Sequence, residues 1–123
     1  MWIDFFNGIN SNARSTLHRL LESEEEICVS DYILTETLQG FRDDREFEIA
    51  ETHLLNFPIY SLKTPYSYIH AAELYRRCRK KGVTIRNTVD CLIAQTAIEH
   101  KLFLLHNDSD FDRISLICEL KTL

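Results

Sequence analysis

The stretch of sequence that decides the fold is IRNTVDCLIAQTAIEHKLFLLHNDSDFDRI, residues 85–114. Apolar residues recur with helical spacing after Asn87, a residue type that caps helix starts. The apolar run LFLL then indicates a strand, and Asp108 follows that strand directly. A helix, a strand and an acidic turn in this order are typical of an α/β fold, in which ligands bind at the carboxyl ends of the strands.

The rest of the chain continues this alternation of helices and strands. Helical spacing and caps predict helices over residues 12–22, 30–40, 45–57 and 64–82. Apolar runs predict strands over residues 26–29, 58–62 and 101–106, with a final short strand at the chain's end. Residues 108–114 are expected to form a turn or one helical turn. Strands that alternate with helices through short links predict a three-layer α/β/α fold with a short, mostly parallel sheet.

Length and composition fit one domain over residues 1–123, with 45% hydrophobic residues and only three glycines and two prolines. No apolar run approaches the roughly 20 residues needed to span a bilayer. The first residues lack a basic segment followed by an apolar one, so no secretory signal is expected. The four cysteines have neither CxxC nor zinc spacing. We therefore expect buried, reduced thiols in a cytoplasmic protein.

Three acidic residues lie near the positions where such a fold binds its ligands. Asp108 follows a strand, Asp90 lies in the first turn of the helix after the IRNT loop, and Glu36 lies about one and a half turns into an earlier helix. Carboxylate oxygens are the ligands that Mg²⁺ and Mn²⁺ prefer. A bound cation of this kind activates water and neutralises developing charge in phosphodiester hydrolysis.

Each of these positions also has a structural explanation. Asp90 comes three residues after Asn87 and resembles part of a capping box, and Asp108 with its polar neighbours resembles turn chemistry. Glu36 also fits an exposed acid on a helix, and His106 a satisfied histidine at a strand end. The positions alone leave both interpretations open.

A basic cluster is a further candidate. It comprises Arg76, Arg77, Arg79, Lys80, Lys81 and Arg86. It fits either a solvated helix end or a surface that contacts RNA phosphates. The net charge of −5, taken alone, argues against non-specific nucleic-acid binding.

The same residues closely resemble a known family. The aspartate at a helix start, the pattern DxLIAxxAxxH, the apolar strand and the NDxDF motif resemble the C-terminal half of PIN domains of the VapC toxin type. Residues 30–44, SDYILTETLQGFRDD, resemble the helix that carries that family's glutamate. Residues 2–8, WIDFFNG, resemble the segment after the family's opening strand. The resemblance covers nearly the whole chain.

The resemblance implies a site, an activity and partners. Glu36, Asp90 and Asp108 match the family's acidic metal-binding and catalytic residues, and Asp110 is a lesser candidate. Members of the family are Mg²⁺- or Mn²⁺-dependent endoribonucleases. They act as toxins of type II toxin–antitoxin systems, are held inactive by a cognate antitoxin, and commonly form homodimers. The alternative function is a PIN-like module that binds an antitoxin without cleaving RNA.

The resemblance also predicts a segment ahead of Met1. The family opens with a short apolar strand, central in the sheet, that ends in an aspartate. Asp4 lies within the later WIDFFNG segment and does not match that aspartate. Met1 stands where the family often has valine, so we expect a GTG valine codon read as a start. As given, the chain is expected to lack this first central strand, whose buried aliphatic side chains are worth roughly 1.5–3 kcal/mol each.

Overall fold

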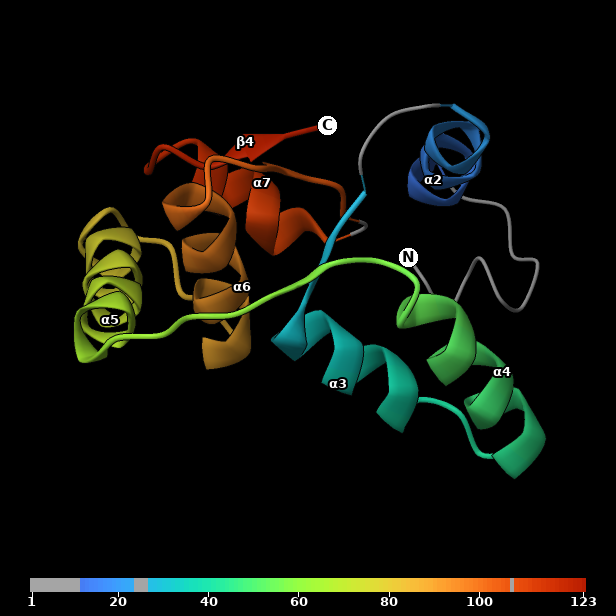
Figure 1. Ribbon diagram of the computed structural model, residues 1–123. Coiled ribbons are helices and arrows are strands. Elements are labelled where there is room, and N and C mark those ends of the chain that lie inside the picture. Colours follow the sequence, from blue (N-terminus) through green and yellow to red (C-terminus); the bar gives the residue numbers. More distant parts are fainter. Residues whose placement is uncertain (1–11, 24–26, 107) are drawn as a thin grey trace. The chain divides into compact units, whose positions relative to one another are not determined.

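The computed structural model describes residues 12–23, 27–106 and 108–123. They fall into two compact units, which join in sequence between Tyr60 and Ser61 (Figure 1). Each unit contains one pair of parallel strands. The expected single domain over residues 1–123 stays a prediction. The WIDFFNG segment with Asp4, and Glu26 of the strand predicted over residues 26–29, lie outside the described residues. The family's opening strand would precede Met1 and stays a prediction. No helix in the described part of the chain is long and apolar enough to cross a membrane.

The first unit alternates helices with two short strands. Its elements are α2 (Asn12–Glu22), β1 (Val29–Ser30), α3 (Asp31–Gln39), α4 (Asp44–Leu54) and β2 (Ile59–Tyr60). β1 pairs with β2 in parallel, with Val29 opposite Ile59 and Ser30 opposite Tyr60. α2 has the predicted bounds, whereas both strands are shorter than predicted.

The N-caps of α3 and α4 explain where these two helices begin. Ser30 closes the strand and caps α3, because its hydroxyl accepts a hydrogen bond from Ile33 N at 3.1 Å. Asp43 caps α4 in the same way through Glu46 N at 2.9 Å. α4 ends at Leu54, earlier than the predicted residue 57. Pro58 disfavours helical backbone at the residue before it, Phe57, which is the predicted last residue of the helix.

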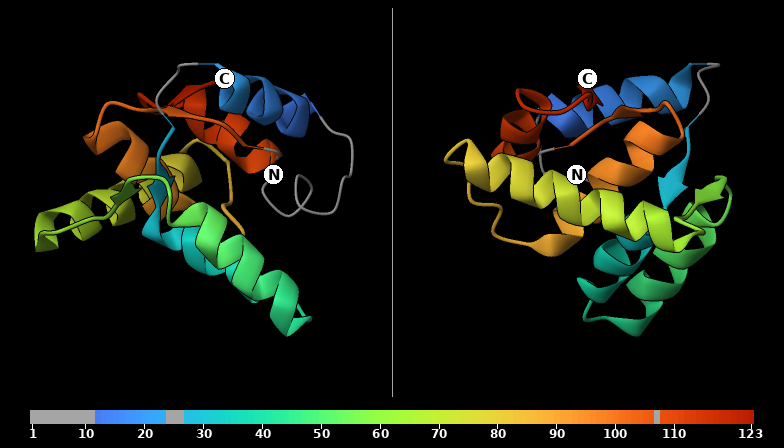
Figure 2. Two further views of the ribbon diagram at one scale, coloured as in Figure 1. Left: turned by 45° about the vertical axis from the view of Figure 1, so that its right-hand side comes forward. Right: turned by 90° about the vertical axis from the view of Figure 1, so that its left-hand side faces the viewer.

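The second unit packs two long helices beside the other pair of strands. Its elements are α5 (Pro65–Lys80), α6 (Thr88–Glu99), β3 (Phe103–Leu104), α7 (Ser109–Ser115) and β4 (Lys121–Thr122). α5 packs against α6 (Figure 2). β3 pairs with β4 in parallel, with Phe103 opposite Lys121 and Leu104 opposite Thr122, so the predicted final strand is present.

Helix α5 has the start and stop that the sequence predicts. Thr64 caps it by accepting a hydrogen bond from Ser67 N at 3.3 Å, and Pro65 takes the first helical position. Gly82 follows the end of the helix with φ +81°, a left-handed conformation that side-chain-bearing residues resist. The turn or single helical turn predicted over residues 108–114 is a longer helix of seven residues, α7.

Helix α6 runs through the core of the second unit. Buried residues face several sides of it rather than one stripe: Asp90, Cys91, Ile93, Ala94, Gln95, Thr96 and Ala97. Three of the four cysteines are buried and all are free thiols, as the sequence predicts for reduced cysteines. Burial raises the pKa of the Cys91 thiol to about 12, with smaller contributions from Cys78, Asp90 and Cys118.

Candidate metal centre

Asp90 is fixed by the start of α6. Asn87 caps this helix, because its side-chain oxygen accepts a hydrogen bond from Val89 N at 3.0 Å and its carbonyl accepts one from Asp90 N at 3.0 Å. The Asp90 residue is only 7% exposed. A negative charge in the first turn interacts favourably with the helix dipole. The cap therefore fixes the backbone of Asp90 in the first turn of α6, where its side chain is buried.

Asp108 caps α7 with one of its two carboxylate oxygens. Its Oδ1 accepts a hydrogen bond from Asp110 N at 2.9 Å. This is the turn chemistry that the sequence offered as the structural explanation of Asp108. The second oxygen, Oδ2, has no hydrogen-bond partner among the described residues. The same side chain can therefore hold the helix start and still present one oxygen to a cation.

Asp110 is the most deeply buried of the three aspartates, at 1% exposure. Its Oδ1 accepts a hydrogen bond from Arg113 Nη1 at 2.9 Å, and its Oδ2 accepts one from Arg86 Nε at 3.4 Å. A buried carboxylate without such partners would be costly. Each oxygen still has a further lone pair, so the arginines do not exhaust its capacity to bind a ligand.

These three carboxylates converge. One oxygen each from Asp90, Asp108 and Asp110 lies within 4.8 Å of the others. Two oxygens on opposite sides of a Mg²⁺ ion are about 4 Å apart, which is close to the spacing of these three oxygens. Like charges at this spacing repel each other and favour a bound cation. The donor set, all carboxylate oxygens, fits Mg²⁺ or Mn²⁺.

His106 supports the backbone that leads into this cluster. Its Nδ1 accepts a hydrogen bond from Asp108 N at 3.2 Å, and its Nε2 lies 3.3 Å from Asp112 Oδ1. Its ring also lies against Phe111, with centroids 5.2 Å apart. Both ring nitrogens thus have partners, in agreement with the satisfied histidine that the sequence suggests.

The predicted site residues are only partly brought together. Asp90 and Asp108 meet as expected, and Asp110, a lesser candidate in the sequence, lies as close as they do. The sequence signal for Asp110 is its position two residues after the capping aspartate, whose side-chain oxygen accepts a hydrogen bond from Asp110 N. Glu36 is half-buried on α3 in the first unit, and its convergence with the aspartates stays a prediction.

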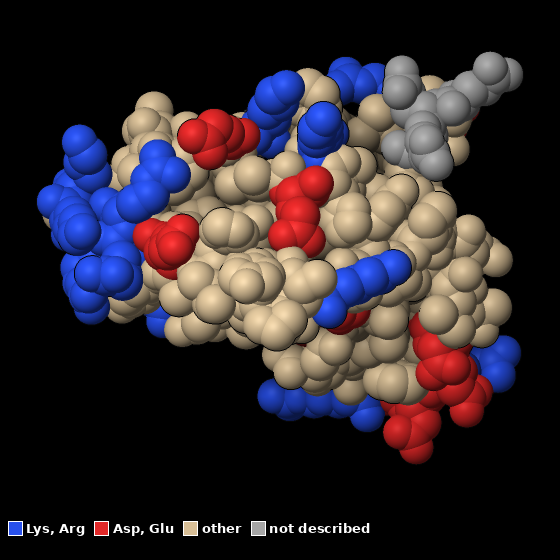
Figure 3. Space-filling model, turned by 60° about the vertical axis from the view of Figure 1, so that its left-hand side comes forward, with Lys and Arg blue, Asp and Glu red and all other residues tan. Residues whose placement is uncertain are grey.

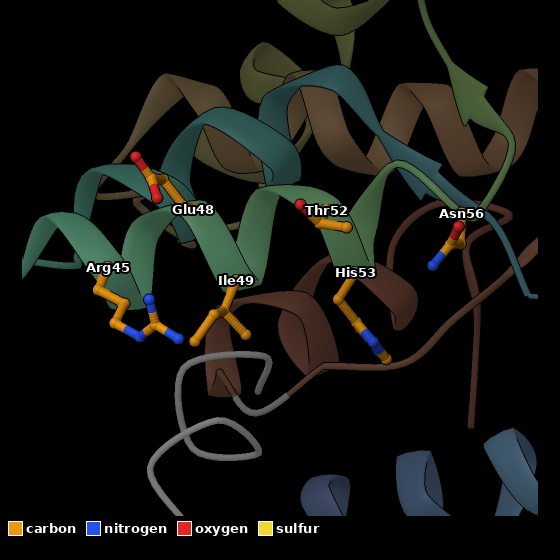
Figure 4. Close-up of a pocket in the computed structure, with 6 residues that line it drawn as sticks. All are labelled: Arg45, Glu48, Ile49, Thr52, His53 and Asn56. Carbon is orange, nitrogen blue, oxygen red and sulfur yellow. The ribbon is translucent and has the colours of Figure 1, made fainter.

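An open pocket in the first unit offers no comparable chemistry. Arg45, Ile49 and His53, four residues apart, project from the same side of α4 into it (Figure 4). Its remaining lining residues are Glu48, Thr52 and Asn56. A single carboxylate among mixed side chains lacks the convergent donors that hold a hard cation. The aspartate cluster of the second unit is therefore the candidate site.

Comparison with protein families gives an independent assignment. The PIN domain model matches residues 1–116. VapC ribonuclease Mb1587 of Mycobacterium bovis is 34% identical to the chain over 121 residues, which cover 98% of the chain and 90% of the relative. Ribonuclease VapC11 of Mycobacterium tuberculosis matches with the same identity and coverage.

Solved structures with the same fold are also found. VapBC2 from Rickettsia felis, determined bound to a DNA fragment from the promoter, matches with a TM-score of 0.73 and 22% identity. VapBC-1 from nontypeable Haemophilus influenzae matches with a TM-score of 0.70 and 17% identity. Both alignments cover 98% of this chain and 90% of the other. The predicted fold class, a PIN-like α/β/α fold with short parallel strands, is confirmed. The chain belongs to the PIN-domain family, among its VapC-type members.

Proposed function

We propose that the chain is a metal-dependent endoribonuclease, the toxin of a type II toxin–antitoxin system, which hydrolyses RNA phosphodiester bonds. The observation that carries the proposal is the convergence of Asp90, Asp108 and Asp110 in a PIN-domain chain. The ribonuclease activity named for its 34% identical relatives supports RNA as the substrate.

In this proposal Asp90 and Asp108 hold Mg²⁺ or Mn²⁺, and Glu36 completes the acidic set from α3. The bound ion would activate water and neutralise the charge that develops on the phosphate. The chain's own contribution is orientation. The cap of α6 fixes Asp90, and the Oδ1 hydrogen bond of Asp108 leaves its Oδ2 for the ion. Donors held in place before the substrate arrives need no reorganisation during the reaction.

The proposed partners are a cognate antitoxin and a second copy of the chain. Both structural neighbours are VapBC assemblies, which supports an antitoxin. The homodimer rests on the family resemblance. Free, buried thiols are typical of proteins in a reducing compartment, which supports action in the cytoplasm.

A cleavage assay on purified chain tests the proposal. RNA should be cleaved with Mg²⁺ or Mn²⁺ and not with EDTA, and Asp90→Asn should abolish cleavage by removing a charged ligand. Asp44→Asn is the matched control, because Asp44 is also an acid in the first turn of a helix but is exposed on α4. Cleavage that survives EDTA would refute the metal mechanism. Antitoxin binding without any metal-dependent cleavage would instead favour the non-cleaving module.

A further inference from the structure

Four basic side chains gather at the carboxyl end of α5. They are Arg76, Arg79, Lys80 and Lys81, hereafter the α5 basic cluster, and all four are exposed. None forms an ion pair with any residue that the structure describes. Figure 3 shows Lys and Arg side chains gathered at one edge of the face it presents. The chain as a whole carries a net charge of −5, so this group of positive charges without ion-pair partners is a local feature.

The fold does not require so many charges at this position. A basic residue in the last turn of a helix interacts favourably with its dipole. However, Arg76 lies three residues before Arg79 and four before Lys80, and like charges at these spacings destabilise a helix. Arg77, by contrast, has a structural role, because it donates a hydrogen bond to the carbonyl of Ile117 at 2.9 Å. An anionic partner would offset the repulsion within the α5 basic cluster.

The cluster is connected to the metal centre by a short loop. Lys81 and Arg86 are five residues apart, a span of at most about 18 Å. Arg86 contacts Asp110 in the centre, as does Arg113. Their side chains are 73% and 52% exposed, and a guanidinium has five N–H donors. Both arginines therefore keep donors for a further anion beside the metal centre.

We propose that Arg86, Arg113 and the α5 basic cluster form one phosphate-binding track for an RNA strand whose scissile phosphate lies at the metal centre. The inference rests on the proposed function, because the chemistry of that centre makes a phosphodiester chain the expected anion. The loop keeps Lys81 and Arg86 at most about 18 Å apart, a distance that a few successive phosphates of one strand can span. The RNA backbone would leave the centre past Arg86 and cross the end of α5.

Equilibrium binding tests the track without cleavage. The Asp90→Asn chain is titrated into a labelled 20-nucleotide single-stranded RNA, with anisotropy read between 50 and 200 mM KCl. The cluster variant adds Arg76→Gln, Lys80→Gln and Lys81→Gln. Losing three phosphate contacts should lower the slope of log affinity against log salt by about 2, and should weaken binding about ten- to a hundredfold at 0.1 M salt.

Two further variants distinguish the loss of positive charge in the α5 basic cluster from an equal change in net charge at other positions. The first control carries Arg19→Gln, Arg42→Gln and Lys63→Gln, which change the net charge equally at exposed positions that are not members of the track. Lys63 precedes the other end of α5, a helix about 24 Å long. This control should bind within about twofold of the Asp90→Asn chain. The second keeps the charges through Arg76→Lys, Lys80→Arg and Lys81→Arg, and should restore binding.

The outcomes are distinct. Equal affinity and salt slope for the cluster and control variants would overturn the track. Weaker binding of an acidic protein partner, with RNA binding unchanged, would also overturn it and make the cluster a protein-docking surface. The proposed function fails separately, if the unsubstituted chain does not cleave RNA with Mg²⁺ or Mn²⁺.

Discussion

Asp108 and Asp110 lie close together, yet their substitution by asparagine should change the stability of the metal-free chain by very different amounts. In Asp110→Asn, a carboxylate that accepts hydrogen bonds from two arginines loses its charge. A hydrogen bond to a charged group is worth about 1.5–3 kcal/mol. The amide oxygen of asparagine can replace only one of the two acceptors. Because Arg86 and Arg113 are largely exposed, no charge is stranded in the interior. We expect a loss of about 2–3 kcal/mol in the free energy of unfolding.

Asp108→Asn should instead leave the metal-free chain almost as stable as before. Asparagine caps helices as well as aspartate does, so the bond from Asp110 N to the side-chain oxygen is retained. Removing one of three neighbouring negative charges also relieves repulsion. We expect a change within about 0.5 kcal/mol. The variant should lose most of its response to Mg²⁺, because the oxygen left for the ion is replaced by an amide nitrogen.

Urea unfolding in EDTA and in excess Mg²⁺ measures both effects. An ion that binds only the folded chain adds about 2.7 kcal/mol at a hundredfold excess over its Kd. The unsubstituted chain should show this gain and Asp108→Asn should not. The reasoning is refuted if Asp108→Asn is as unstable in EDTA as Asp110→Asn, or if it keeps the full gain from Mg²⁺.

Three further predictions concern the frame of the site. Burial raises the pKa of Cys91 from 9.0 to about 12, so the buried neutral thiol contributes fully to the free energy of unfolding below pH 9, and that contribution falls by about 1.4 kcal/mol per pH unit above it. Cys91→Ala should therefore reduce the loss of stability above pH 9 in unfolding curves. Half-buried Cys28 should react with iodoacetamide before Cys91. Gly82→Ala should cost about 1–2 kcal/mol through left-handed strain alone, since an added Cβ meets nothing within 4 Å; unchanged thermal stability would contradict this. Asn87→Ala should cost about 1 kcal/mol by removing the bond to Val89 N, and Asn87→Ser should recover most of that loss.

Local signals in the sequence predict the helices better than the strands. Thr64, Pro65 and Gly82 define both ends of α5, and the structure agrees at each. The run LFLL indicates a strand, but only Phe103 and Leu104 pair, because a strand's length depends on where its partner β4 meets it. The apolar run is visible in the sequence, whereas the partner strand and its register are not, and Phe103 is 61% exposed although it is apolar.

Helix α7 is longer than the sequence predicts, for a different reason. The polar residues around Asp108 indicate a turn, and that turn is the cap of the helix. Phe111 and Ile114, three residues apart and both buried, continue it along one side. This spacing is visible in the sequence, but two apolar residues three positions apart cover only about one turn, which is too little to distinguish a helix from a turn by pattern alone.

The site itself shows the same division between local and non-local information. The positions of Asp90 and Asp108 follow from the order of helix, strand and turn. For Asp110, the pairing with Arg113 is local, three residues along α7, but the pairing with Arg86 is not, because Arg86 lies 24 residues earlier in the chain. Only the packed structure shows that Asp110 is both a neighbour of the proposed ligands and the anchor of two arginines.

These carboxylates are proposed to make the chain a metal-dependent ribonuclease. The most direct measurement is the cleavage rate of an end-labelled RNA as Mn²⁺ is titrated, for the unsubstituted chain and for Asp108→Asn. We predict a rate that rises to saturation with Mn²⁺, vanishes in EDTA, and is about a hundredfold or more lower in Asp108→Asn, in line with the loss of one transition-state contact. Cleavage that is independent of Mn²⁺, or equal in the two chains, would contradict the account.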